Sequence, residues 1–130
     1  MKAISQAARA ILSRLTAGLN VPGDSRKLDN APGTYMPLCV ECIAPDFYSL
    51  AHYGEQNGDA MRDPDVVIWV PPMVGEAYPV SFRNDYAGVD NEYVEFDEDH
   101  KVVGLDVDGQ EDLASFCATW FDNLVEQQGV

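Results

Sequence analysis

The densest run of side chains that could carry chemistry lies between residues 52 and 63. Four of them could supply nitrogen and oxygen ligands to a divalent metal: His52, Glu55, Asp59 and Asp63. Such a metal could activate water, which makes a metal-dependent hydrolase one possible function. Their spacing matches no established ligand motif, whereas Asn57-Gly58 favours a tight turn and Arg62 can pair with a carboxylate. The sequence therefore favours a turn that fixes one edge of a sheet, with the hydrolase as the alternative.

Two other patterns resemble metal sites but have simpler explanations. Cys39 and Cys42 form a C-x-x-C, yet residues three apart in a strand point to opposite faces. Only Cys117 and two histidines remain to complete a zinc site, so we expect buried small residues. The run Asp106-Val-Asp-Gly-Gln-Glu-Asp112 lacks the third alternating oxygen ligand and the twelfth-position glutamate of a calcium loop, and helix capping explains its acids. We expect no catalytic residues, metal or cofactor.

The remaining sequence feature that could indicate a function is an acidic stretch. Residues 85–112 hold eleven acids and one lysine. Same-face residues of a strand lie ~6.6–6.8 Å apart, within the Debye length of ~8 Å at physiological salt, so their charges reinforce one another. We expect seven of these acids to form a partner-binding ridge: Asp85, Asp90, Glu92, Glu95, Asp97, Glu98 and Asp99. The alternative is that they only keep the surface hydrated.

The charge is unevenly divided along the chain. Of the 130 residues, residues 1–64 carry six basic and seven acidic side chains, whereas residues 65–130 carry fifteen acids against Arg83 and Lys101. So many like charges in one region destabilise a compact domain, and an electrostatically selected partner would offset that cost. The chain lacks a polybasic patch, a membrane span and a secretory signal. We therefore expect no direct binding to nucleic acid or membranes, and a reducing cytoplasm for its odd number of cysteines.

The elements that must position these side chains follow from periodicity. Apolar residues at helical spacing predict a first helix over residues 4–15 that ends at Gly18. Residues 18–37 hold three prolines and three glycines without a periodic pattern and predict a long irregular connection. Strands are expected at six places: residues 38–43, 47–53, 66–70, 78–83, 92–96 and 102–107. The last two should pair across the acidic turn at residues 97–101.

The chain ends in the clearest helix pattern, an apolar stripe over residues 113–124. Asp108 and Glu111 resemble a capping box at its start. Helix, strands and helix predict a single α+β domain over residues 1–130, with a small antiparallel sheet of about five strands flanked by the N- and C-terminal helices.

Several segments along the chain form a recognisable combination: Tyr35-Met-Pro-Leu38 through Glu41, His52 to Asp59, Asp63-Pro64, Tyr78 to Asp85, Phe116-Cys-Ala-Thr-Trp120, Asn123-Leu124 and Gln128-Gly129. Together they resemble an uncharacterised domain family that is common on bacterial plasmids, integrative elements and prophages. The resemblance implies an origin on mobile DNA and carries no established activity or site residue.

Together these observations predict an acidic cytoplasmic inhibitor from a mobile genetic element. It would occupy the basic nucleic-acid-binding surface of a host defence protein, a CRISPR effector complex or a restriction enzyme, through partial DNA mimicry. The alternatives are the metal-dependent hydrolase and a structural module of an element-encoded complex that binds through residues 18–37, with Tyr35 and Met36, or an apolar patch. The sequence leaves the oligomeric state open.

Overall fold

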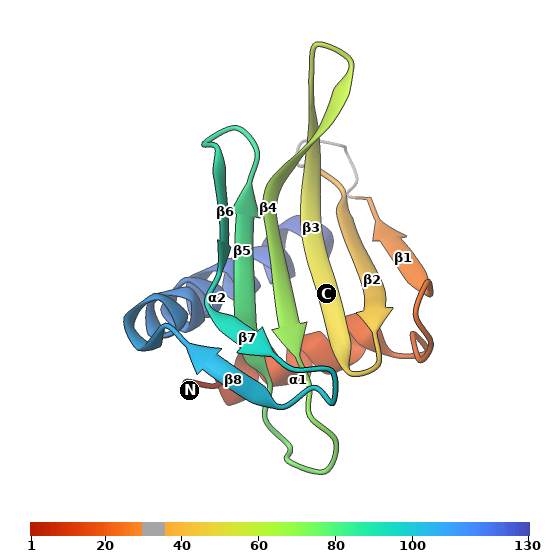
Figure 1. Ribbon diagram of the computed structural model, residues 1–130. Helices are drawn as coiled ribbons and strands as arrows, with labels where there is room; N and C mark the ends of the chain where they lie inside the picture. Colours follow the sequence, from red (N-terminus) through yellow and green to blue (C-terminus); the bar gives the residue numbers. More distant parts are fainter. Residues whose placement is uncertain (30–35) are drawn as a thin grey trace.

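The computed structural model describes residues 1–29 and 36–130. A helix, eight strands and a second helix follow one another along the chain (Figure 1). Their bounds are α1 Gln6–Thr16, β1 Ser25–Leu28, β2 Leu38–Ala44, β3 Phe47–Gln56, β4 Asp59–Trp69, β5 Tyr78–Asn84, β6 Val89–Glu92, β7 Val94–Phe96, β8 Val102–Leu105 and α2 Val107–Gln128. The expected α+β domain with a helix at each end is confirmed.

The strands form two antiparallel sheets. Strands β1 to β6 pair in chain order in a six-stranded meander, and β7 pairs with β8 in a separate hairpin. The Asn57-Gly58 turn between β3 and β4 is confirmed, because both residues have positive φ angles of 53° and 85°. The main sheet therefore needs only short connections between neighbouring strands, and the small hairpin follows its last strand.

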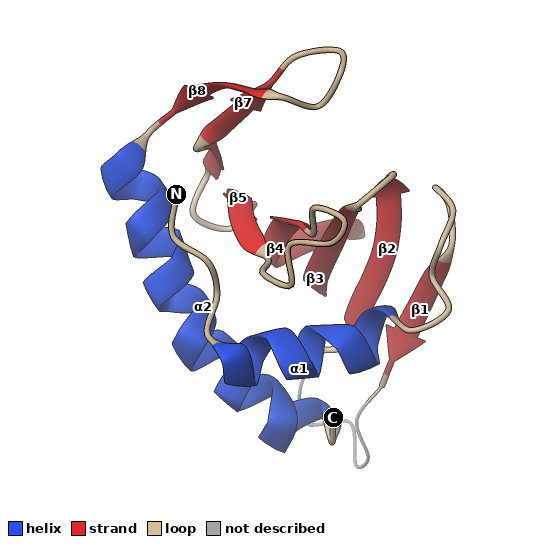
Figure 2. Cartoon of the chain, turned by 90° about the horizontal axis from the view of Figure 1, so that it is seen from below, coloured by secondary structure: helices blue, strands red, loops and turns tan. Residues whose placement is uncertain are grey.

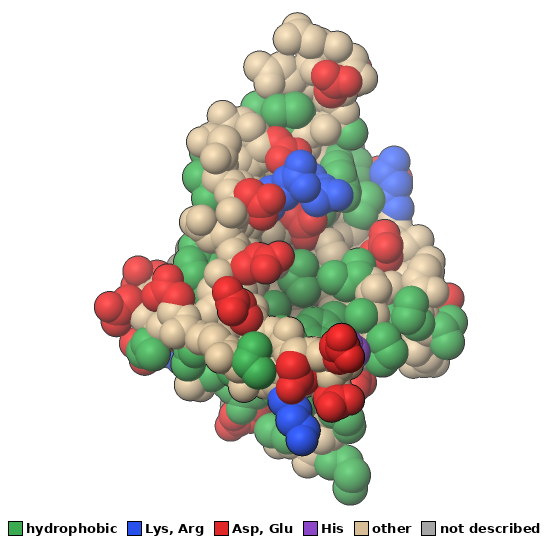
Figure 3. All heavy atoms as spheres, viewed as in Figure 1, with side chains coloured by type: hydrophobic (Ala, Val, Ile, Leu, Met, Phe, Trp, Pro, Cys, Tyr) green, Lys and Arg blue, Asp and Glu red, His purple; other side chains and the backbone are tan. Residues whose placement is uncertain are grey.

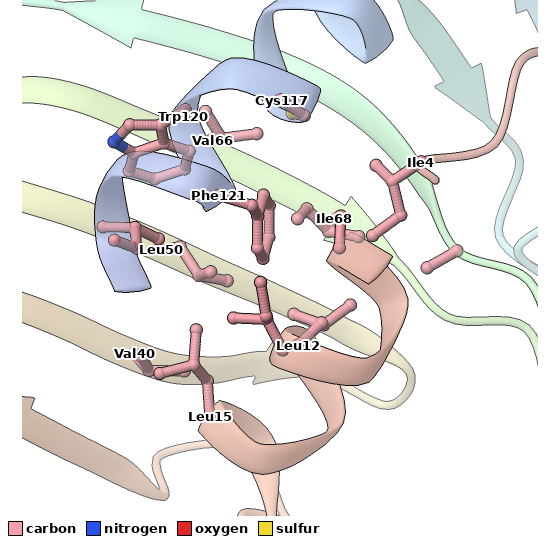
Figure 4. Packing of buried hydrophobic residues seen from close by; sticks show 14 of the residues in the cluster. Ile4, Leu12, Leu15, Val40, Leu50, Val66, Ile68, Cys117, Trp120 and Phe121 are labelled. Carbon is pink, nitrogen blue, oxygen red and sulfur yellow. The ribbon is translucent and has the colours of Figure 1, made fainter. Parts of the chain in front are cut away.

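Both helices pack on one face of the six-stranded sheet (Figure 2). Alternate residues of the central strands, including Val40, Leu50 and Val66, face them and are fully buried. Phe121 of α2 and Leu12 of α1 meet above these residues in the core (Figure 4). This arrangement leaves the other face of the sheet without helical cover, and we call it the open face.

Side chains cap both ends of α1 and the start of α2. The Ser5 hydroxyl accepts a hydrogen bond from the Ala8 amide at the start of α1, and the Arg26 guanidinium donates to the Leu15 and Ala17 carbonyls at its end. Asp106 caps α2 by accepting from the Gly109 amide. The capping box predicted at Asp108 and Glu111 was therefore wrong by two residues, since Asp108 lies inside the first turn.

Two further expectations need correction. The connection expected over residues 18–37 contains β1, whose Leu28 is its only aliphatic residue, so no alternating pattern announced it. The strand expected over residues 92–96 is interrupted at Tyr93, whose amide donates to Val80 of the main sheet while its carbonyl accepts from Asp106. The pairing of residues 94–96 with 102–105 is confirmed.

Gln110 ties three parts of the fold together and is completely buried. Its amide nitrogen donates to the Lys2 and Pro79 carbonyls at 2.8 and 3.1 Å, and its oxygen accepts from the Lys2 amide at 2.7 Å. The N-terminal segment, β5 and α2 thus share one side chain. The residue pattern of α2 marks Gln110 only as a polar residue at a position of the apolar stripe.

We expect Gln110→Leu to lower the free energy of unfolding by about 3 kcal/mol, because it leaves buried backbone groups without partners at about 1–3 kcal/mol each. Urea denaturation followed by circular dichroism measures this change. The matched control is Gln6→Leu, which changes an exposed glutamine at the start of α1. A loss below about 1 kcal/mol for Gln110→Leu would show that water replaces these bonds.

Candidate binding surface

The open face presents two rows of side chains that cross the sheet. The register places Glu41, Ser49, Val67, Ser81 and Glu92 side by side in one row from β2 to β6. The next row runs through Ala51, Asp65, Arg83 and Asp90. Figure 3 shows this face, on which carboxylates surround a central area of hydrophobic surface. Polar and apolar groups are therefore interleaved on a surface that no helix covers.

An ion-pair network lies in the second row. Asp65 is 7% exposed, accepts a hydrogen bond from the Ser49 hydroxyl at 2.6 Å and lies 3.5 Å from the Arg62 guanidinium. Asp85 accepts from the Arg62 amide at 2.8 Å and from the Arg83 guanidinium at 2.6 Å. Burial raises the pKa of Asp65, and its bond to Ser49 and the charge of Arg62 act against that rise.

A bulge makes this network possible. Arg62 and Asp65 are three apart, and in a regular strand they would point to opposite faces. The β3–β4 register shifts so that one residue, His52, opposes both Asp63 and Pro64. This irregularity turns Arg62 to the same side as Asp65. The sequence predicts that Arg62 pairs with a carboxylate, but no local pattern marks Asp65 or Arg83 as part of a site.

The β7–β8 hairpin folds back over one end of the open face and is held there by aromatic packing. The Phe96 ring lies 5.0 Å from Phe47 and 5.1 Å from Trp69, both on the sheet, and His100 lies 5.3 Å from Phe47. These are edge-to-face contacts, the favourable geometry for aromatic pairs. The acidic turn of the hairpin is therefore anchored to the sheet and keeps a defined position beside it.

A pocket of about 440 Å³ lies between the hairpin and the sheet. Its lining is mostly apolar with two carboxylates: Ile43, Phe47, Val67, Val80, Ser81, Glu92, Val94, Glu95, Phe96 and Val103. A register shift in β5 places the neighbours Val80 and Ser81 both in this lining. Seven strands, from β2 to β8, each contribute to it, which explains why no local pattern predicted the pocket.

The seven acids of the predicted ridge do not form one strand, and they divide by role. Asp85 belongs to the ion-pair network, and Asp97 shapes the β7–β8 turn because its carboxylate accepts from the Asp99 and Lys101 amides. Asp90 is exposed opposite Arg83. The other four are exposed, and none of their carboxylates forms an ion pair with another described residue: Glu92, Glu95, Glu98 and Asp99.

The four residues of the possible hydrolase site lie in different surroundings. His52 is 4% exposed on the helix side, next to Trp120, and its Nδ1 lies 3.1 Å from the Met36 carbonyl. Asp63 accepts from the Asn84 amide, whereas Glu55 and Asp59 are exposed near the end of the β3–β4 hairpin. Across residues 1–29 and 36–130, no three His, Cys, Asp or Glu side chains are grouped closely enough to hold a metal.

The remaining motifs have structural positions. Cys42 is buried and Cys39 half-buried, on opposite faces of β2, and both are free thiols. Burial raises the pKa of Cys117 to about 12, so its thiol stays protonated in the core. Asp106 of the calcium-like run is the cap of α2. Of the segment expected to act as an assembly surface, Tyr35 lies outside the described residues and Met36 is half-buried against Gly54.

Residues 6–130 match the family described as domain of unknown function DUF6908, and the chain belongs to that family. The expected membership of an uncharacterised family is thereby confirmed. Comparisons with curated proteins and with solved structures found no match.

In the described part of the chain, neither helix has the length and apolar character required to cross a membrane.

The ion-pair network predicts how stability depends on pH. Hydrogen bonds from the Arg62 amide and the Arg83 guanidinium lower the pKa of Asp85 below its ordinary value of 3.8. Its stabilising effect is therefore complete above that value and is lost as pH falls through the lower folded-state pKa. We expect Asp85→Asn to unfold at lower urea than the wild type at pH 7, and the difference to shrink as the pH falls below the ordinary value of 3.8 and through the lower folded-state pKa.

The measurement is a series of urea titrations between pH 2 and 7, with exposed Asp122→Asn as the matched control. The control should follow the wild-type curve at every pH. If the difference in stability between wild type and Asp85→Asn stayed constant over the whole pH range, ionisation of Asp85 would not contribute to the free energy of unfolding.

Proposed function

We propose that this protein binds a basic protein partner through its open face and the β7–β8 hairpin. Four exposed carboxylates without ion-pair partners among the described residues carry the proposal: Glu92, Glu95, Glu98 and Asp99. Glu92 and Glu95 line the pocket together with apolar side chains, and Glu98 and Asp99 lie on the turn of the hairpin that covers it. Carboxylates attract a basic surface from a distance and speed encounter. The apolar surface among them supplies the water-excluding contacts that hold a complex together.

An acidic surface that serves only solubility does not need such a pocket. Hydrated acids are normally dispersed over convex surface, whereas here Ile43 and Val103 remain 44% and 63% exposed beside the acids. Exposed apolar side chains that border a pocket and are rimmed by charge are typical of protein-binding sites. This combination favours docking over hydration as the role of the acidic region.

The partner class follows from the charge. Proteins that bind nucleic acid present lysine and arginine to its phosphates, and such a basic surface would be attracted to this face, whereas phosphate itself would be repelled by it. We propose inhibition of such a protein by partial DNA mimicry, because the unpaired carboxylates are few and can replace only a few phosphates. An origin on mobile DNA would make a cytoplasmic CRISPR effector complex or restriction enzyme the target. In this proposal the chain is a binding protein and performs no catalysis.

The proposal predicts salt-dependent displacement of DNA from a target enzyme. We expect the protein to displace fluorescent duplex DNA from one or more members of a panel of purified bacterial CRISPR effector complexes and restriction enzymes. The variant with Lys at Glu92, Glu95, Glu98 and Asp99 should lose about 100-fold in apparent affinity, since each rim charge contributes about 0.2–1 kcal/mol and reversal adds repulsion. Fluorescence anisotropy at about 50 and 300 mM salt measures both effects.

The matched control carries Lys at four exposed acids of α2, outside this surface: Glu111, Asp112, Asp122 and Glu126. Its net charge equals that of the first variant, so a general charge effect would weaken both equally. Asp85 and Asp97 are left unchanged because they bond backbone amides. No displacement by the wild type, or equal loss in the two variants, would overturn the proposal.

A further inference from the structure

The pocket under the β7–β8 hairpin combines an apolar interior with two carboxylates on the same side. Phe47, Val67 and Val80 line it from the main sheet, and Val94 and Phe96 line it from the hairpin. Phe47 is 8% exposed and meets Phe96 edge to face, so these rings form fixed walls. Glu92 and Glu95 complete the lining where β6 passes into β7. A pocket of this kind fits a group with an apolar stem and a positive end.

The position of Glu95 is set by the strand opposite. Glu95 pairs with Gly104 of β8, and a Cβ atom added at Gly104 would lie 3.0 Å from Oε2 and 3.3 Å from the Cβ of Glu95. The absence of a side chain at residue 104 therefore lets Glu95 lie across β8. Glu92 and Glu95 also line a second, adjoining pocket with Asp106. Negative charge is thus concentrated along one side of the apolar cavity.

No basic side chain of the described residues neutralises this side. The ion pairs of Arg62 and Arg83 are with Asp65 and Asp85 in the neighbouring row, and the third pair joins Lys27 to Asp29 at the far edge. Two carboxylates left facing one cavity repel each other, and a cation supplied from outside would relieve that repulsion.

We propose that this pocket takes the side chain of one arginine of the bound protein. This deepens the function proposed above and rests on it. The methylene stem would contact Val67, Val80 and Val94, the guanidinium would reach Glu92 and Glu95, and the aromatic walls offer faces or edges to it. The volume of about 440 Å³ lies within the ~300–1,000 Å³ range of ligand pockets and leaves room for water beside the side chain.

Arginine fits these surroundings better than lysine. Its planar guanidinium presents several donors at fixed angles, so it can bond two carboxylates at once, and it is more weakly hydrated than an ammonium group. An ammonium group would lose more hydration on entering an apolar cavity. The pocket therefore gives the acidic surface a selectivity that charge alone does not provide.

The probe for this site is a capped pentapeptide, Gly-Ser-Arg-Ser-Gly, titrated into the full chain and followed by methyl NMR. We expect shifts at Val67, Val94 and Val103, and binding at least about tenfold tighter than that of the same peptide with citrulline, the neutral isostere, or with lysine. The double variant Glu92→Gln/Glu95→Gln should bind the arginine and citrulline peptides equally. The matched control, Asp122→Asn/Glu126→Gln, should bind like the wild type.

Equal binding of the arginine and citrulline peptides, or shifts confined to other methyl groups, would overturn the pocket assignment. A lysine peptide that bound as tightly as the arginine peptide would overturn the preference for arginine. The inhibitor function and the arginine site can be overturned independently of each other. DNA displacement that depends on the four reversed acids, without peptide binding in the pocket, would support docking and overturn the arginine site. Specific peptide binding without DNA displacement from any enzyme would support the site and overturn the inhibitor function.

Discussion

Both helices pack on the same face of the six-stranded sheet, and the side chains of the opposite face must be accommodated without them. At one end of this face the β7–β8 hairpin covers the side chains, and its Phe96 packs against Phe47 and Trp69. Further along, the ion pairs of Asp65 and Asp85 with Arg62 and Arg83 let charged groups lie on a half-buried surface. The pocket lies between this hairpin and the sheet, on the face that the helices leave uncovered.

This arrangement also decides which charges remain available to a partner. The second half of the chain has only two basic residues, and Arg83 is engaged by Asp85 with Asp90 directly opposite. The main sheet therefore neutralises its own central row, whereas Glu92, Glu95, Glu98 and Asp99 have no ion-pair partner among the described residues. In the proposed complex, a basic partner would relieve the mutual repulsion of these carboxylates. Repulsion within the free protein would thereby contribute to binding affinity.

The fold was largely predictable because its strongest signals are local. The apolar stripe of α2, the Asn57-Gly58 turn and the run at residues 66–70 all correspond to observed elements. The errors fall where tertiary contacts determine the secondary structure. The short strand β1 lacks an alternating pattern and pairs only because β2 lies beside it. The break at Tyr93 depends on hydrogen bonds to Val80 and Asp106, thirteen residues away on either side, which no periodicity records.

On the candidate binding surface, too, local features could be predicted from the sequence, whereas features set by tertiary contacts could not. A count of acids correctly indicates a negative region but treats Asp85, Asp97 and Glu95 as equivalent, although the first two bond backbone amides and only the third lines the pocket. The apolar part of the surface could not be predicted from the sequence, because its residues come from six strands and two of them, Ile43 and Val80, lie at shifts in the pairing register. Charge alone attracts any basic protein, and salt weakens that attraction. A cavity of fixed shape among the charges discriminates between basic side chains, so the geometry of the pocket, more than the number of acids, would determine which partner is retained.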